Sequence, residues 1–332
     1  MRSHLISNLA CNLAHDLTCN VSRDTTHDTT YDTTLQQILA FATSHKDIAL
    51  VTLEGSRANK NAKRDKFQDY DISFFMPDIT PLREDSTWLG RFGEVLMVQM
   101  PESMELFAPD LKAGWFSYLA IYASGLKIDF TLIPLSDVEF YFTNERLTQV
   151  LLDKENIVAK SGIDTSGIPS DRDFWLKPLT QRSFEDCLNE FYHLKGYALR
   201  SFLRREALAY NAYVDSMREC VLILLAWQRA LSAIESTSGV IESKQDSLHT
   251  FNFSYGKHYK YLPKSLPKKT YKLLLQTYAL GNLKQSKKAL KALQILCDKA
   301  SKKIAQTTGF AIPPYKRALK AYTKALSKIH RI

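Results

Sequence analysis

Two acidic residues separated by a single residue, Asp69 and Asp71, constrain what this chain can fold into more than any other feature. They follow an apolar run at 48–53, a Gly-Ser pair at 55–56 and a loop at 57–68, and they lead directly into apolar residues 72–75. Apolar and β-branched runs of this kind predict strands on both sides of the loop. Because side chains i and i+2 of a strand point the same way, Asp69 and Asp71 are expected to share a face.

Two carboxylates this close repel each other unless a cation lies between them or one is protonated. Oxygen ligands of this type suit hard divalent cations, above all Mg²⁺. Gly55 and Ser56 offer backbone N–H groups and a hydroxyl, which together favour an anion. A metal site beside an anion site predicts a nucleoside triphosphate as ligand.

A third carboxylate is expected at the same place. Asp129 is the single acid of the apolar segment 126–133, which has the pattern of a strand. A lone carboxylate in such a run is costly to bury unless it is paired or binds a metal. We therefore group Asp129 with Asp69 and Asp71.

The order of these elements resembles the signature of the nucleotidyltransferase superfamily related to DNA polymerase β. More narrowly, EGSR at 54–57, DKFQDYDI at 65–72 and KIDFTLIPL at 127–135 resemble the aminoglycoside 6-adenylyltransferases that modify streptomycin. Segments 100–111, 184–202 and 254–260 resemble the same family. The similarity extends over roughly 45–330.

The resemblance implies an α/β nucleotidyltransferase domain of the DNA polymerase β type, followed by an α-helical bundle domain. We place the first at 34–160 and the second at 161–332. Residues 1–33 end in a DTT repeat with little apolar surface to bury, and we expect a disordered extension there.

The expected strands lie near 48–54, 70–76, 94–100, 117–123 and 126–133. The expected helices lie at 34–44, as two long helices within 181–235, and at 266–282, 284–307 and 313–330. The Gly- and Pro-containing stretch 164–178 is expected to connect the domains.

The implied activity is transfer of AMP from ATP to the 6-hydroxyl of streptomycin, with Mg²⁺ as cofactor and antibiotic resistance as the result. The resemblance assigns metal binding and catalysis to Asp69, Asp71 and Asp129, with Glu190 as the candidate general base. Nucleotide binding is assigned to Gly55, Ser56, Arg57 and Lys257, and substrate binding to Glu102, Glu105 and Asp186. Asp129, Glu105 and Glu102 compete with Glu190 for the base role, Arg57 could be a plain loop charge, and Lys257 an ordinary solvated lysine.

Composition narrows the class of protein. Hydrophobic content of 45% and charged content of 24% are typical of a globular chain. No apolar run approaches the ~20 residues that span a bilayer, and the N-terminus lacks the continuous apolar region of a secretory signal. The five cysteines form no CxxC pair, so we expect reduced thiols in a cytoplasmic protein, without a membrane partner.

The charge is unevenly distributed. Residues 241–332 carry 20 Lys and Arg against 3 Asp and Glu, a net +17, whereas residues 1–240 carry 24 against 32, a net −8. The basic part keeps open an alternative, a nucleotidyltransferase that modifies RNA or a protein, as in toxin–antitoxin systems. A catalytically silent binding protein is a third possibility, which the intact acids argue against. The expected partners are ATP and streptomycin rather than nucleic acid, for a monomer or weak dimer.

Overall fold

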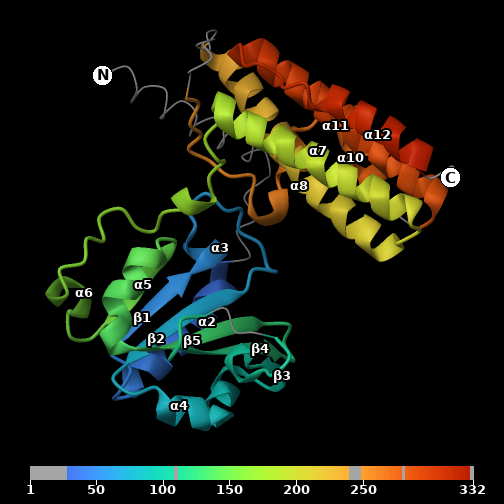
Figure 1. Cartoon of the computed structure of the whole chain (residues 1–332). Coiled ribbons are helices and arrows are strands. Elements are labelled where there is room, and N and C mark those ends of the chain that lie inside the picture. The colour runs from blue at the N-terminus through green and yellow to red at the C-terminus, as the bar shows by residue number, and fades with distance from the viewer. Residues whose placement is uncertain (1–27, 108–110, 239–247, 279–280, 330–332) are drawn as a thin grey trace. The chain divides into compact units, whose positions relative to one another are not determined.

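The computed structural model describes residues 28–107, 111–238, 248–278 and 281–329, and these divide into two compact units (Figure 1). The sheet unit comprises the described residues up to Asp173, and the helical unit begins at Phe174. The sequence places the domain boundary earlier, after residue 160. Residues 28–33, assigned to the extension, begin helix α2 (Asp28–Ser44), while residues 1–27 lie outside the described residues. The domain limits themselves stay a prediction.

The sheet unit is built on one mixed six-stranded sheet with the order β3-β4-β5-β2-β1-β6. Its strands β2 and β5 run parallel, and the other neighbours pair antiparallel. Five strands match expected ones, whereas β6 lies outside the expected strands. The strands are β1 (Leu50–Glu54), β2 (Tyr70–Met76), β3 (Val95–Gln99), β4 (Phe116–Tyr122), β5 (Lys127–Pro134) and β6 (Thr148–Asp153).

Alternation along β2 gives the sheet two buried faces. Ile72 and Phe74 point into a core that includes α2 and the aromatic residues of the 3₁₀ helix η2 (Ser86–Phe92). Phe75 points to the other face, where it packs with α5 (Val138–Asn144) and α6 (Ile157–Lys160). Asp71 has the parity of Phe75 and therefore lies on the α5 face. Short elements α3 (Gly55–Ala58), α4 (Thr80–Glu84), η3 (Pro101–Ser103) and η4 (Leu135–Asp137) connect the strands.

The helical unit is a set of packed helices dominated by α7 (Gln181–Leu203), α8 (Ala207–Ser238), α11 (Leu283–Thr308) and α12 (Tyr315–Ile329). A capping box begins α7, because Thr180 Oγ1 accepts from the Ser183 amide at 3.0 Å and Ser183 Oγ from the Thr180 amide at 2.9 Å. Gly309, with a φ of 77°, ends α11 in the left-handed conformation.

Shorter helices complete the two units. The expected helix at 266–282 begins only at Lys268, directly after Pro267, and changes to a 3₁₀ helix at Gln276. The short segments are η5 (Arg172–Phe174), η6 (Lys257–Tyr259), α9 (Leu262–Ser265), α10 (Lys268–Leu275) and η7 (Gln276–Tyr278).

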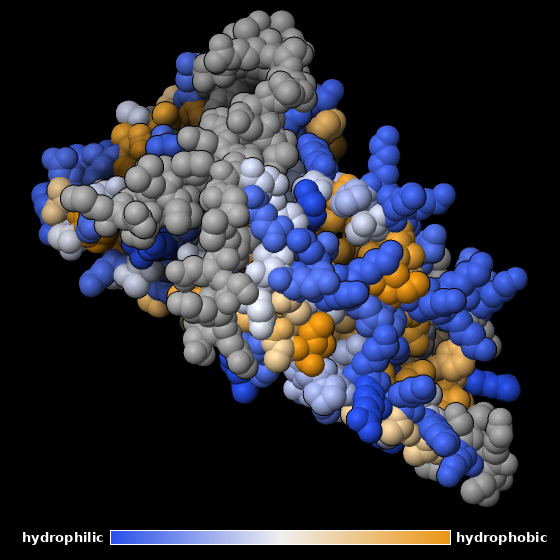
Figure 2. Space-filling view, turned by 90° about the horizontal axis from the view of Figure 1, so that it is seen from above, coloured by the Kyte–Doolittle hydropathy of each residue, from blue (hydrophilic) through white to orange (hydrophobic). Residues whose placement is uncertain are grey.

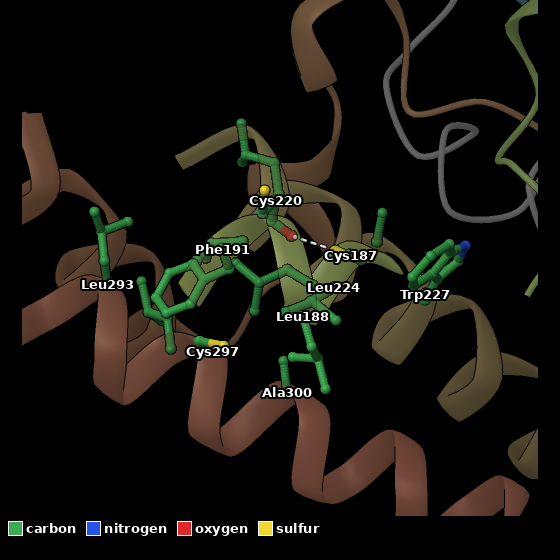
Figure 3. Close-up of a cluster of buried hydrophobic side chains, with 14 of the residues drawn as sticks. Cys187, Leu188, Phe191, Cys220, Leu224, Trp227, Leu293, Cys297 and Ala300 are labelled. Atoms are coloured by element: carbon green, nitrogen blue, oxygen red, sulfur yellow. Dashed lines mark hydrogen bonds between the residues drawn. The ribbon is translucent and has the colours of Figure 1, made fainter. Parts of the chain in front are cut away.

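The core of the helical unit contains free thiols from three helices (Figure 3). Cys187 Sγ on α7 donates to the carbonyl oxygen of Cys220 on α8 at 3.4 Å. Burial raises the pKa of the Cys297 thiol on α11, so this group stays protonated. These residues therefore pack as small apolar side chains, as the expectation of reduced thiols requires. Among the described helices, none has the length and apolar character to cross a membrane.

Candidate active site

Carboxylates from three neighbouring strands form a row on the α5 face of the sheet. Glu54 of β1 pairs with Asp71 of β2, and Asp71 pairs in turn with Asp129 of β5. Asp69 lies one residue before β2, on the same face as Asp71. One oxygen atom from each of Asp69, Asp71 and Asp129 lies within 4.8 Å of the other two. The structure thus brings together the three acids that the sequence grouped.

Burial and mutual repulsion make it unfavourable for all the carboxylates of this row to be ionised. Burial raises the pKa of Asp71 to about 7, and the charges of Asp69 and Asp129 act in the same direction. Burial also raises the pKa of Asp129, although Lys127 opposes the shift. A cation among these oxygens would remove the repulsion.

The donor set fits a hard divalent cation. Asp129 Oδ1 is buried and has no hydrogen-bond partner among the described residues. A buried polar atom without a partner is costly, and coordination would satisfy it. The carboxylates of Asp69 and Asp71 supply further oxygen ligands of the type that Mg²⁺ binds.

Lys127, which the sequence analysis did not single out, contacts two of the three acids. Its ammonium donates to Asp69 Oδ2 at 3.2 Å and makes a short contact with Asp129 Oδ2. Burial alone would lower the pKa of Lys127, but the hydrogen bonds and charges of Asp129 and Asp69 outweigh it and raise the pKa above its usual value. Lys127 is therefore a cation at neutral pH. The signal in the sequence was its i, i+2 spacing from Asp129.

Gly55 allows the turn after β1 to approach Asp71. Its φ is +66°, and a Cβ at this position would lie 2.2 Å from Asp71 Oδ2. Any side chain would therefore displace the carboxylate. Gly55 and Ser56 begin the short helix α3, so the Gly-Ser pair lies at the start of a helix.

Arg57 points inward, and its interactions differ from those expected. Its Nε donates to the carbonyl oxygen of Asp69 and its Nη2 to that of Gln68, both at 2.6 Å. The guanidinium also stacks on Tyr70, with Cζ 3.6 Å from the ring centroid. At 5% exposure, Arg57 is placed to fix the loop before Asp69.

Glu54, also missed from the sequence, is held by hydroxyl groups. Thr52 Oγ1 donates to Glu54 Oε1 at 2.5 Å, and the Tyr141 hydroxyl makes a short hydrogen bond to the same oxygen. The Tyr141 hydroxyl also lies 2.7 Å from Thr148 Oγ1. Burial raises the pKa of Glu54 to about 7 against the effect of these hydrogen bonds, and the charge of Asp71 raises it further. The network joins β1, α5 and β6 beside Gly55.

The remaining expected site residues have diverse surroundings. Glu102 Oε2 accepts from the amide of Ser117 at 2.8 Å and from its hydroxyl at 2.7 Å, whereas Glu105 is exposed. The helical unit contains the other three, all exposed: Asp186 and Glu190 on α7, and Lys257 at the start of η6. Asp186 forms an ion pair with Arg182 at 3.1 Å.

Comparison with known proteins places these residues in a family. The streptomycin adenylyltransferase family matches residues 29–326. The aminoglycoside 6-adenylyltransferase of Bacillus subtilis (strain 168) is 37% identical over 290 residues, 87% of this chain and 94% of that protein. Its Staphylococcus aureus counterpart is 34% identical, over 87% of this chain and 96% of that protein.

A solved structure of an aminoglycoside 6-adenyltransferase is also similar to this chain. The crystal structure of an aminoglycoside 6-adenyltransferase from Bacillus subtilis has 33% sequence identity and a TM-score of 0.41, covering 89% of this chain and 97% of that one. The assignment rests on the family match over most of the chain and on the sequence identity to the two adenylyltransferases. The chain belongs to the streptomycin adenylyltransferase family.

Proposed function

We propose that this protein transfers AMP from ATP to the 6-hydroxyl of streptomycin and so confers resistance to the drug. Membership of the family and the names of its relatives support an aminoglycoside as acceptor. The observation that carries the chemistry is the cluster of Asp69, Asp71 and Asp129, in which Asp129 Oδ1 has no hydrogen-bond partner in the part of the chain that the structure describes. In this proposal the sheet unit is a nucleotidyltransferase domain of the DNA polymerase β type, and the helical unit is an α-helical bundle domain.

The reaction needs a nucleophile, a leaving group and control of charge. The acceptor oxygen forms a bond to the α-phosphorus while the bond from that phosphorus to pyrophosphate breaks, and the hydroxyl proton passes to a carboxylate. Glu190 is the proposed base, with Asp129 as the alternative. Asp69, Asp71 and Asp129 would hold Mg²⁺, which when bound stabilises the negative charge on the phosphate oxygens.

Other residues have positioning roles in this proposal. The backbone at Gly55 and Ser56 would receive the triphosphate, and Lys257 would contact a phosphate as a point charge. Arg57 would act on the nucleotide through the loop that it fixes, since its Nε and Nη2 donate to backbone carbonyls. Glu102, Glu105 and Asp186 would attract the guanidinium groups of the drug. We propose a cytoplasmic monomer or weak dimer that acts without nucleic acid.

The direct test is product analysis. Purified protein with ATP and Mg²⁺ should add the mass of one AMP to streptomycin and release pyrophosphate, and EDTA should block both. Kanamycin should remain unmodified, since a drug with differently placed charges presents the wrong hydroxyl. Modification of kanamycin with streptomycin untouched would overturn the acceptor, whereas no ATP turnover with any aminoglycoside would overturn the activity.

A further inference from the structure

The ammonium group of Lys127 contacts two of the three clustered carboxylates that would hold a divalent cation. Lys127 is the first residue of β5 and precedes Asp129 by two positions, so both side chains project from the same face of the strand. Its neighbour Ile128 pairs with Tyr70, the residue that follows Asp69. Register therefore brings Lys127 beside Asp69 as well as Asp129.

The same carboxylates serve both purposes. Lys127 Nζ contacts Asp69 Oδ2 at 3.2 Å and Asp129 Oδ2 more closely. These carboxylates belong to the three whose oxygens gather within 4.8 Å. A lone pair that accepts from the ammonium is not available to a metal ion, and a second positive charge a few Å away repels that ion.

We propose that Lys127 competes with the divalent ion for Asp69 and Asp129 and thereby sets the affinity of the site for metal. This inference rests on the metal site of the proposed function. The ammonium offsets repulsion among the three carboxylates and has to release Asp129 before the ion takes full coordination. At 39% side-chain exposure, Lys127 has room to turn toward solvent.

The test is binding of Mn²⁺ alone, without nucleotide or drug, by electron paramagnetic resonance of the free ion. Lys127→Met should bind Mn²⁺ about tenfold more tightly than wild type, a modest effect because the group is partly solvated. Lys127→Arg, which keeps the charge, should stay within about threefold of wild type. Unchanged or weaker Mn²⁺ binding by a folded Lys127→Met protein would overturn the inference.

Thermal melting provides a second measurement that does not depend on activity. In EDTA, Lys127→Met should melt below wild type, because the carboxylates lose their cation, and saturating Mn²⁺ should raise its melting temperature more than that of wild type. Equal gains on Mn²⁺ addition would count against the inference.

Two controls separate the inference from the proposed function. Lys112 forms a 2.6 Å ion pair with Asp137 in the same unit and is similarly exposed, at 35%, so Lys112→Met should leave Mn²⁺ affinity unchanged. Asp71→Asn should weaken Mn²⁺ binding strongly. Absence of Mn²⁺ binding by wild type would overturn the metal site and the inference together, whereas normal wild-type binding that is lost in Asp71→Asn but unchanged in Lys127→Met would overturn the inference alone.

Discussion

At the scale of single residues, the central position is Asp71, which lies between Glu54 and Asp129 in the row of acids. Asp71→Asn removes the charge of a proposed metal ligand while keeping the shape of the side chain. Loss of an outer-shell partner of a metal costs 10–100-fold, so loss of a proposed direct ligand should lower kcat by more than about 100-fold. Steady-state kinetics with circular dichroism would check it. Exposed Glu139→Gln is the control, and a folded Asp71→Asn protein with near-normal turnover would contradict the assignment.

Gly55 provides a steric test of the same site. Gly55→Ala places a Cβ 2.2 Å from Asp71 Oδ2 in a residue with positive φ. The left-handed conformation alone costs about 1–2 kcal/mol, and the displaced carboxylate should reduce turnover sharply. Gly90→Ala is the matched control, because nothing lies within 4 Å of its Cβ position. Urea denaturation and kcat should both separate the two variants.

Glu54 predicts a specific dependence of stability on pH. Burial raises its pKa from 4.5 to about 7 in the folded protein. Between these values the unfolded chain gives up its proton first, so stability from this group is complete below pH 4.5 and is lost as the pH rises through 7. The Glu54→Gln side chain cannot ionise. The free energy of unfolding of this variant, relative to that of wild type, should therefore be about 2 kcal/mol higher at pH 8 than at pH 5.

Urea denaturation in EDTA at the two pH values measures this difference. Tyr141→Phe serves as a companion, since it removes a hydrogen bond to Glu54 but leaves the carboxylate able to ionise. If the stability difference between Glu54→Gln and wild type does not change with pH, Glu54 does not titrate in this range.

The acids of the site could be predicted from the sequence, whereas their partners could not. Asp69, Asp71 and Asp129 each stand out as acids beside apolar strand residues. The roles of Lys127 and Glu54 depend on which strands are neighbours and in which register they pair, and tertiary contacts decide both. Arg57 shows the same limit, because its position after Ser56 does not reveal that it folds back onto Asp69.

At the scale of elements, Arg57 ties α3 to the end of the loop before β2. Arg57→Lys keeps the charge but loses the planar group that donates to two carbonyls and stacks on Tyr70. It should destabilise the protein by about 1–3 kcal/mol and weaken Mn²⁺ binding through displacement of Asp69. Chemical denaturation and Mn²⁺ titration check both effects. A raised KM for ATP with unchanged stability and Mn²⁺ affinity would instead support direct contact with the triphosphate.

The elements themselves follow the local pattern except where chain-breaking residues or tertiary pairing intervene. Strands β1, β2, β4 and β5 lie where apolar alternation puts them, and α7 begins at a capping box. Strand β6 was missed because its half-buried pattern carries weak alternation, and its pairing with β1 stabilises it as a strand.

At the scale of the whole molecule, the acceptor substrate was predicted from family resemblance, because residue patterns alone do not indicate it. Apolar pattern indicated a sheet-containing part followed by helices, and two compact units are present. The choice of acceptor depends on side chains that local patterns do not bring together. Substrate class is thus the part of the assignment that depends most on relatives.

The basic charge of the C-terminal region has a surface counterpart in the helical unit. Exposed cations follow one side of α11 and α12, and long hydrophilic side chains project from this part of the molecule (Figure 2). They are Lys284, Lys287, Lys288, Lys291, Lys299, Lys302, Lys316, Arg317, Lys320, Lys324 and Lys328. Within the described ranges, the ion pairs of this group include that of Lys316 with Asp298, at 2.6 Å. Most of the charge therefore faces solvent.

Such a surface should bind polyanions weakly, without transferring AMP to them. We expect RNA binding that is measurable by fluorescence anisotropy near 50 mM salt and falls by orders of magnitude by about 200 mM, because binding releases counterions. Replacing Lys284, Lys288 and Lys291 with Gln should reduce the salt dependence but leave drug adenylylation unchanged. Tight binding that survives 200 mM salt, or transfer of labelled AMP from ATP onto RNA, would instead support the alternative of an RNA-modifying enzyme, since solvated charge alone accounts for neither.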